Sequence, residues 1–224
     1  MTIEIGGGTD MEYDCIRKVK CFQHCDKNYN ILCFQLPFIC PLCRRNVSCS
    51  ESRIPPYSIP SPFGDAMSSP YSVLIKPTYG SFIRDYENSS NLHIGITDSK
   101  GVAYDYDEEG IHVNSLSWNQ CVVIPLSKAL IAGVQDGWDN NLYQFSRNHR
   151  WSTDWYRDSS HNCFTFVLQF LHHMDINRLM PCVASRSEFC KEQIVPHTTR
   201  AAQFIGLYRQ IEKEGFVIQV VKPS

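Results

Sequence analysis

The stretch that decides the fold runs from residue 161 to residue 171 and reads His-Asn-Cys-Phe-Thr-Phe-Val-Leu-Gln-Phe-Leu. Its apolar residues predict a helix from Cys163 to Met174 that is apolar on almost every side and therefore buried. Asn162 is a good N-cap, which places Cys163 in the first turn, beside unpaired backbone N–H groups and the positive end of the helix dipole. Both features favour a thiolate, and so a nucleophile. The competing interpretation is a core cysteine, because free cysteine is among the most buried residue types.

The rest of the pattern predicts an antiparallel sheet followed by helices. Segments 71–76, 92–97, 102–106 and 121–125 have the apolar, β-branched character of strands. Turn-forming residues at 98–101 and 107–110 predict hairpins between them. Helices are expected at 127–147 and 199–214, with a final strand at 216–221. Strands followed by helices indicate an α+β domain.

Composition divides the chain of 224 residues into three parts. Seven of the eleven cysteines lie between Cys15 and Cys49, which marks a Cys-rich head at 1–49. A Ser/Pro-rich connector is expected at 50–70, where the prolines favour irregular, extended backbone. The α+β domain is expected at 71–224.

Charge and hydropathy exclude several function classes. Lys and Arg number 21 against 23 Asp and Glu, so a net charge of −2 offers no electrostatic attraction to nucleic acid. No window has the apolar length of a membrane span, and the N-terminus lacks the basic start and apolar stretch of a signal peptide. Many cysteines without a secretory signal predict an intracellular location, in the reducing cytoplasm or nucleus.

The Cys-rich head carries residues spaced like the ligands of a structural zinc ion. Cys40 and Cys43 form a C-x-x-C turn, which can hold one tetrahedral ion. Cys21, His24 and Cys25 offer three candidates for the other two places. We favour His24 and Cys25 as the second ligand pair. Cys21 remains the alternative, because adjacent ligands are unusual and Cys21 paired with His24 or Cys25 would give a more ordinary spacing. The prediction is a zinc-ribbon-like head, and the alternative is that these cysteines pack or remain free.

A nucleophilic thiol needs a base close to it in space. His93 is the candidate, because it places a polar ring within the apolar strand 92–97, and it precedes Cys163 by 70 residues. The alternative for His93 is a surface histidine on the solvent face of that strand. His112 follows on the next expected strand. It is the candidate for a third, orienting residue if its register turns it to the same face.

These features together resemble a known group of enzymes. The strand around His93, the hairpin with Gly101 to Tyr106 and the His161-Asn162-Cys163-x-Thr165-Phe166 run resemble the circularly permuted papain-like thiol enzymes. The likeness is stronger to the PPPDE family of deSUMOylating and deubiquitinating isopeptidases than to the lecithin–retinol acyltransferase group. In those families the histidine lies on a sheet strand and precedes the cysteine, which begins a helix packed against the sheet. The resemblance covers residues 70–175, and it implies Cys163 as nucleophile and His93 as general base.

Over its whole length the chain resembles the makorin opposite-strand protein family, which has a C-P-x-C head and the same H-N-C run. That resemblance implies no particular activity. The papain-like resemblance implies a permuted papain-like sheet packed on a buried helix. It also implies a cysteine isopeptidase-like hydrolase or acyltransferase acting on a protein partner, such as one carrying a ubiquitin-like modifier. The alternative is a catalytically inactive papain-like interaction module with a structural zinc head, and a third interpretation makes Cys163 a core residue only.

Overall fold

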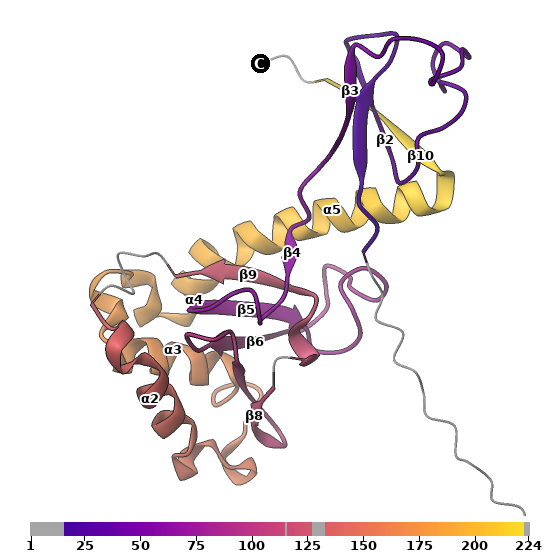
Figure 1. Ribbon diagram of the computed structural model, residues 1–224. Coiled ribbons are helices and arrows are strands. Elements are labelled where there is room, and N and C mark those ends of the chain that lie inside the picture. The colour runs from indigo at the N-terminus through magenta and orange to yellow at the C-terminus, as the bar shows by residue number, and fades with distance from the viewer. Residues whose placement is uncertain (1–15, 115, 127–132, 222–224) are drawn as a thin grey trace, which may run out of the picture. The chain divides into compact units, whose positions relative to one another are not determined.

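The chain folds into two compact units, each with its own antiparallel sheet. A computed structural model describes residues 16–114, 116–126 and 133–221 (Figure 1). The smaller unit takes in the described part of Met1–Ile59 and of Gly215–Ser224, and the larger unit spans Pro60–Glu214. Among the helices of the described residues, none combines the length and the apolar character that a bilayer crossing requires.

The larger unit is built on a six-stranded sheet with the strand order β4-β9-β5-β6-β7-β8. Its strands are β4 (Phe63–Gly64), β5 (Ser72–Pro77), β6 (Leu92–Thr97), β7 (Ala103–Asp107), β8 (Gly110–Val113) and β9 (Cys121–Pro125). The two predicted hairpins join β6 to β7 and β7 to β8. The chain then crosses back, so that β9 pairs with β5 (Figure 1). The antiparallel sheet predicted from the sequence is confirmed.

The described residues of this unit form four α-helices, and the predicted apolar helix lies among them. They are α2 (Gln135–Ser146), α3 (Cys163–His173), α4 (Arg186–Phe189) and α5 (Val195–Glu214), with a π-helical turn at Cys190–Ile194 before α5. Seven residues of α3 are buried, and Phe170 packs edge-on against Trp138 of α2 with 5.0 Å between the ring centroids. Of the helix predicted at 127–147 the structure shows α2, and residues 127–132 lie outside the described residues.

The start of α3 is fixed by a reciprocal capping box. Asn162 Oδ1 accepts hydrogen bonds from the backbone N–H groups of Phe164 (3.1 Å) and Thr165 (3.4 Å). The Thr165 hydroxyl in turn accepts one from the Asn162 N–H group at 3.4 Å. These bonds satisfy backbone donors that the first turn of a helix leaves without partners. Cys163 is therefore the first residue of α3, as the sequence predicts.

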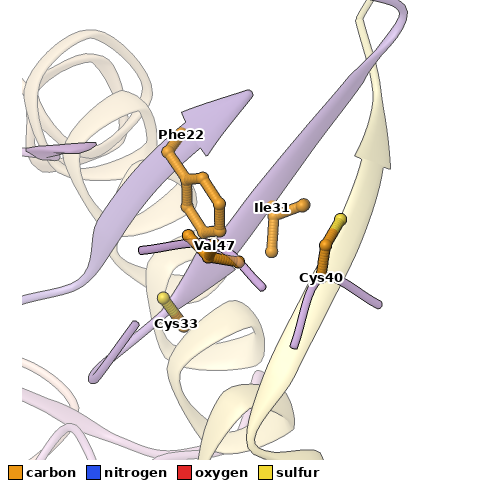
Figure 2. Close-up of a cluster of buried hydrophobic side chains, with 5 residues drawn as sticks. All are labelled: Phe22, Ile31, Cys33, Cys40 and Val47. Atoms are coloured by element: carbon orange, nitrogen blue, oxygen red, sulfur yellow. The ribbon is translucent and has the colours of Figure 1, made fainter. Parts of the chain in front are cut away.

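The smaller unit is a four-stranded antiparallel sheet with the order β10-β2-β1-β3. Its strands are β1 (Lys20–Gln23), β2 (Tyr29–Cys33), β3 (Ile54–Ser58) and β10 (Phe216–Val220). One cluster of buried side chains beside this sheet is drawn in Figure 2: Phe22, Ile31, Cys33, Cys40 and Val47.

The boundaries of the units differ from those that composition predicts. The final strand, expected in the main domain, is β10 of the smaller unit, where it pairs with β2 over five residues. The segment 50–70, predicted to be irregular, contributes β3 and β4. Pro55 and Pro56 lie in β3 at the edge of the sheet, the position where strands tolerate proline. Pairing between distant segments leaves no local signal, so composition could not reveal it.

Two glycines provide a matched test of the fold. Gly101, in the β6–β7 turn, has φ +79°, and a Cβ there would lie 2.5 Å from the Ala66 carbonyl oxygen. Gly206 is exposed within α5, and a Cβ there would meet nothing within 4 Å. We expect Gly101→Ala to lower the free energy of unfolding by about 2 kcal/mol, and Gly206→Ala to raise it by up to about 1 kcal/mol.

Urea denaturation followed by circular dichroism measures both changes. Equal stabilities for the two variants would contradict the turn geometry described for Gly101.

Candidate functional site

A buried histidine–aspartate pair lies in the sheet of the larger unit. His93 Nε2 is 2.8 Å from Asp105 Oδ1, and the two residues are 8% and 4% exposed. Strand register explains their meeting, since Gly95 of β6 lies opposite Asp105 of β7. His93 precedes Gly95 by two residues, so it points to the same face of the sheet as Asp105.

Trp118 holds this pair from one side. Its indole Nε1 donates a hydrogen bond to Asp105 Oδ2 at 3.0 Å, and its ring stacks on the His93 imidazole with 5.7 Å between centroids. A Cβ at Gly95 would come within 2.9 Å of the Trp118 ring, so the glycine provides the space that the indole occupies. Both oxygens of Asp105 are thus engaged, and the orientation of the His93 ring is set by a hydrogen bond and by packing.

Cys163 is the third member of the cluster. Its thiol lies close enough to the His93 imidazole to raise the pKa of that ring. Because Asp105 engages Nε2, Nδ1 is the ring nitrogen left for the thiol. The result is a chain of thiol, imidazole and carboxylate, an arrangement that allows a histidine to accept a proton from a nucleophile while a third group orients the ring.

The pKa values of the pair favour its charged form. Burial by itself lowers the pKa of His93, but the hydrogen bonds with Asp105 and Cys163 and the charges of both partners raise it to about 9. Burial raises the pKa of Asp105, yet the hydrogen bond and the charge of His93, with the hydrogen bond from Trp118, hold it below its usual value. At neutral pH the pair is therefore an imidazolium and a carboxylate.

His93 and Cys163 both line a cleft of about 990 Å³. Three consecutive acidic residues of the β7–β8 turn, Asp107 to Glu109, line it as well, as does Tyr156. Burial, a hydrogen bond with Asp158 and the nearby Cys163 all raise the pKa of Tyr156, so this phenol stays protonated at neutral pH. The cleft has the size of sites that take small molecules or short chain segments.

His112, the predicted orienting residue, has a different partner. It lies opposite Asp105 in the β7–β8 register and lines the same cleft, but its Nε2 is 2.7 Å from Asp107 Oδ1. The position beside His93 belongs to Asp105, which the sequence reasoning missed. A signal was present in the strand Ala-Tyr-Asp-Tyr-Asp (103–107), where carboxylates alternate with aromatic rings and so share one face.

A second cluster of potential ligands lies in the smaller unit. The ligand atoms of His24, Cys25, Cys40 and Cys43 all lie within 4.8 Å of one another. Cys25 Sγ is 4.0 Å from Cys40 Sγ, and Cys43 Sγ is 3.4 Å from His24 Nδ1. Two sulfurs bound at about 2.3 Å to a tetrahedral ion are about 3.8 Å apart. These four residues could therefore bind a metal ion with little rearrangement.

Local structure brings the two halves of this cluster together. His24 and Cys25 directly follow β1, in the turn that leads to β2. The C-x-x-C segment is closed into a tight turn by the Cys40 N–H group, which donates to the Arg45 carbonyl at 2.8 Å, and by Arg44, whose φ is 62°. The second ring nitrogen of His24 is 2.6 Å from the Ser50 hydroxyl, a contact that fixes the ring as outer-shell partners do in metal sites.

Cys21, the alternative ligand, lies outside this cluster. It is buried in β1, opposite Leu32 of β2 and Tyr57 of β3, and it raises the pKa of the neighbouring Tyr57 phenol. Of the three candidates for the second ligand pair, the structure brings His24 and Cys25 to the C-x-x-C turn.

Comparisons with known proteins match the parts of the chain that contain both clusters. Residues 56–211 match the family model described as DUF4796 C-terminal, and residues 18–47 match the one described as DUF4796 N-terminal. The human MKRN2 opposite strand protein is 34% identical over 197 residues, which cover 88% of this chain and 87% of that protein. No solved structure matches the chain. The chain therefore belongs to the DUF4796 family, as a relative of the MKRN2 opposite strand protein.

Proposed function

We propose that the chain is a thiol hydrolase or acyltransferase with a permuted papain-like catalytic unit. Cys163 would be the nucleophile, His93 the general base and Asp105 the residue that orients it. The observation that carries this proposal is the position of His93, whose ring contacts both the Cys163 thiol and the Asp105 carboxylate. The papain-like resemblance of residues 70–175 adds a substrate class, an isopeptide bond to a ubiquitin-like protein.

The proposed reaction uses His93 to move protons in both directions. In the reacting state the thiol proton already lies on His93 Nδ1, and Cys163 Sγ attacks the carbonyl carbon of an amide or ester as a thiolate to form a carbon–sulfur bond. His93 then returns a proton to the leaving nitrogen or oxygen as its bond to that carbon breaks. Water or an acceptor, deprotonated by His93, attacks the thioester and regenerates the thiol. The Cys163 N–H group, at the start of α3, is the first donor for the oxyanion.

A second candidate function is a protein-interaction module without turnover. The low exposure of the pair favours it, because Cys163 is 5% exposed and His93 is 8% exposed. In this alternative the cleft and the metal-binding head would dock a protein partner, and the imidazolium–carboxylate pair would only hold β6 and β7 together.

We also propose that His24, Cys25, Cys40 and Cys43 hold a structural zinc ion. One imidazole nitrogen and three thiolates form a common zinc donor set, and four protein ligands leave no open position for catalysis. The ion would stabilise the folded form of the smaller unit, whose described core contains few large side chains.

Thiol labelling tests the activated pair. We expect iodoacetamide to alkylate Cys163 of the wild type at neutral pH, because His93 beside the thiol can carry its proton and pair with the thiolate. His93→Ala should slow this labelling about tenfold or more at neutral pH and change the dependence of its rate on pH. Mass spectrometry that resolves each modified cysteine measures the rates.

His112→Ala is the matched control, because His112 lines the same cleft but forms its hydrogen bond with Asp107. This variant should be labelled at the wild-type rate. An identical pH profile for wild type and His93→Ala would refute the enzyme proposal and leave the interaction module. Loss of labelling in Cys163→Ala confirms the site of modification.

Stability should depend on pH through His93. Its pKa rises from 6.5 to about 9 on folding, so its contribution is complete below pH 6.5 and is lost as the pH rises through 9. The free energy of unfolding of the wild type should therefore fall across this window relative to that of His93→Gln. Urea denaturation across the window measures the difference, with His112→Gln as control. A difference that does not change with pH would contradict the raised pKa.

Metal analysis of the purified full chain tests the zinc proposal. We expect one zinc ion per chain in the wild type, and much less in Cys43→Ser, which removes one ligand from the partly exposed side of the cluster. Cys49→Ser removes an exposed thiol outside the cluster and should retain the ion. Wild-type protein that is folded but holds well under one zinc per chain would refute the site.

A further inference from the structure

A second cavity, of about 610 Å³, lies along α3 in the larger unit. Its charged and titratable lining is basic throughout: Arg150, Arg186, His172 and His173. No acidic side chain of the described residues lines it. Over the whole chain acidic residues outnumber Lys and Arg by 23 to 21, so a lining without acidic residues differs from the average composition. The positive charge of this lining favours an anion as ligand.

The two guanidinium groups of this cavity are held by aromatic rings. Arg150 Cζ lies 5.4 Å from the centroid of the Trp151 ring, and Arg186 Cζ lies 4.5 Å from that of Phe164. Neither arginine takes part in the salt bridges found among the described residues, and the charge of Arg186 partly offsets the rise that burial causes in the pKa of the Cys190 thiol. Stacking leaves the edge of a guanidinium group, where its N–H donors lie, available to a ligand.

The cavity also has an apolar wall and one unsatisfied polar group. Leu168 of α3 and Val183 contribute apolar surface. Gln169 Oε1 is buried without a hydrogen-bond partner, and a buried polar atom of this kind requires an explanation. Rotation of the amide would present its NH₂ group, and thus two further donors, to an anion in the cavity.

We propose that this cavity binds the phosphoryl group of an organic phosphate that carries an apolar substituent. The two negative charges of a phosphate monoester match two arginines, whose planar forks suit phosphate oxygens. Leu168 and Val183 would contact the substituent, and the volume is typical of small-molecule sites. Arg186 also lines the cleft of Cys163, so the ligand would bind next to that cleft, whether or not the thiol is catalytic.

Calorimetric titration of the full chain with phenyl phosphate tests this proposal. We expect saturable binding at one site, weakened about tenfold or more by Arg150→Gln and by Arg186→Gln, because each removes charged hydrogen bonds. Arg200→Gln is the matched control, since Arg200 is exposed on α5 and does not line the cavity. Circular dichroism establishes that each variant is folded, and Cys163→Ser should bind as the wild type does.

Two further probes separate the parts of the ligand. Inorganic phosphate should bind more weakly than phenyl phosphate, because it lacks the apolar group, and benzoate should bind more weakly because it carries a single charge. Binding of benzoate as tight as that of phenyl phosphate would overturn the choice of phosphate, and equal binding of inorganic phosphate would overturn the apolar substituent. Absence of saturable binding, or binding that both arginine substitutions leave unchanged, would overturn the site itself.

Discussion

The larger unit depends on the satisfaction of one buried carboxylate. Asp105 is 4% exposed, and a charge at that depth is tolerated only where it is paired and hydrogen-bonded. His93 supplies the opposite charge and Trp118 supplies a second donor, so each oxygen has a partner. This requirement extends to the backbone. It fixes the register between β6 and β7, because a shift of one residue would turn Asp105 away from His93. It also requires glycine at position 95, because the Trp118 indole fills the space that a side chain would occupy.

Two independent pieces of local structure bring the thiol to this pair. The sheet places His93 and Asp105 through hairpin register, and the capping box of Asn162 and Thr165 begins α3 at Cys163. Neither piece requires the other in order to form, so their meeting is a property of the tertiary fold. The smaller unit repeats this pattern, because one ligand pair follows β1 and the other closes its own tight turn after β2.

The sequence predicted these local pieces well and the distant pairings poorly. Alternating or continuous apolar runs and turn residues identified β6, β7 and the hairpin between them, and Asn162 identified the first residue of α3. His112 and Asp105 lie in strands that are both half polar, so periodicity alone could not decide which of them meets His93. The pairing of β10 with β2 joins segments from opposite ends of the chain, and no local pattern encodes it. Cys21 lies within β1, whereas His24 and Cys25 lie in the turn after it, and the spacing of the ligands does not specify where the strand ends.

The energetics of the buried pair bear on which proposed function is the better explanation. Removing two charges from water costs several kcal/mol, and well-packed apolar residues of similar volume often replace such a pair with no loss of stability. If these positions served only the stability of the sheet, apolar side chains would serve as well, as the fully buried Ile94 and Ile96 do in the same strand. Stability of the sheet alone therefore explains the ion pair of His93 and Asp105 poorly. An imidazolium that also contacts a thiol at the first residue of a helix has the properties that proton transfer requires, and for this reason we place the thiol enzyme ahead of the interaction module.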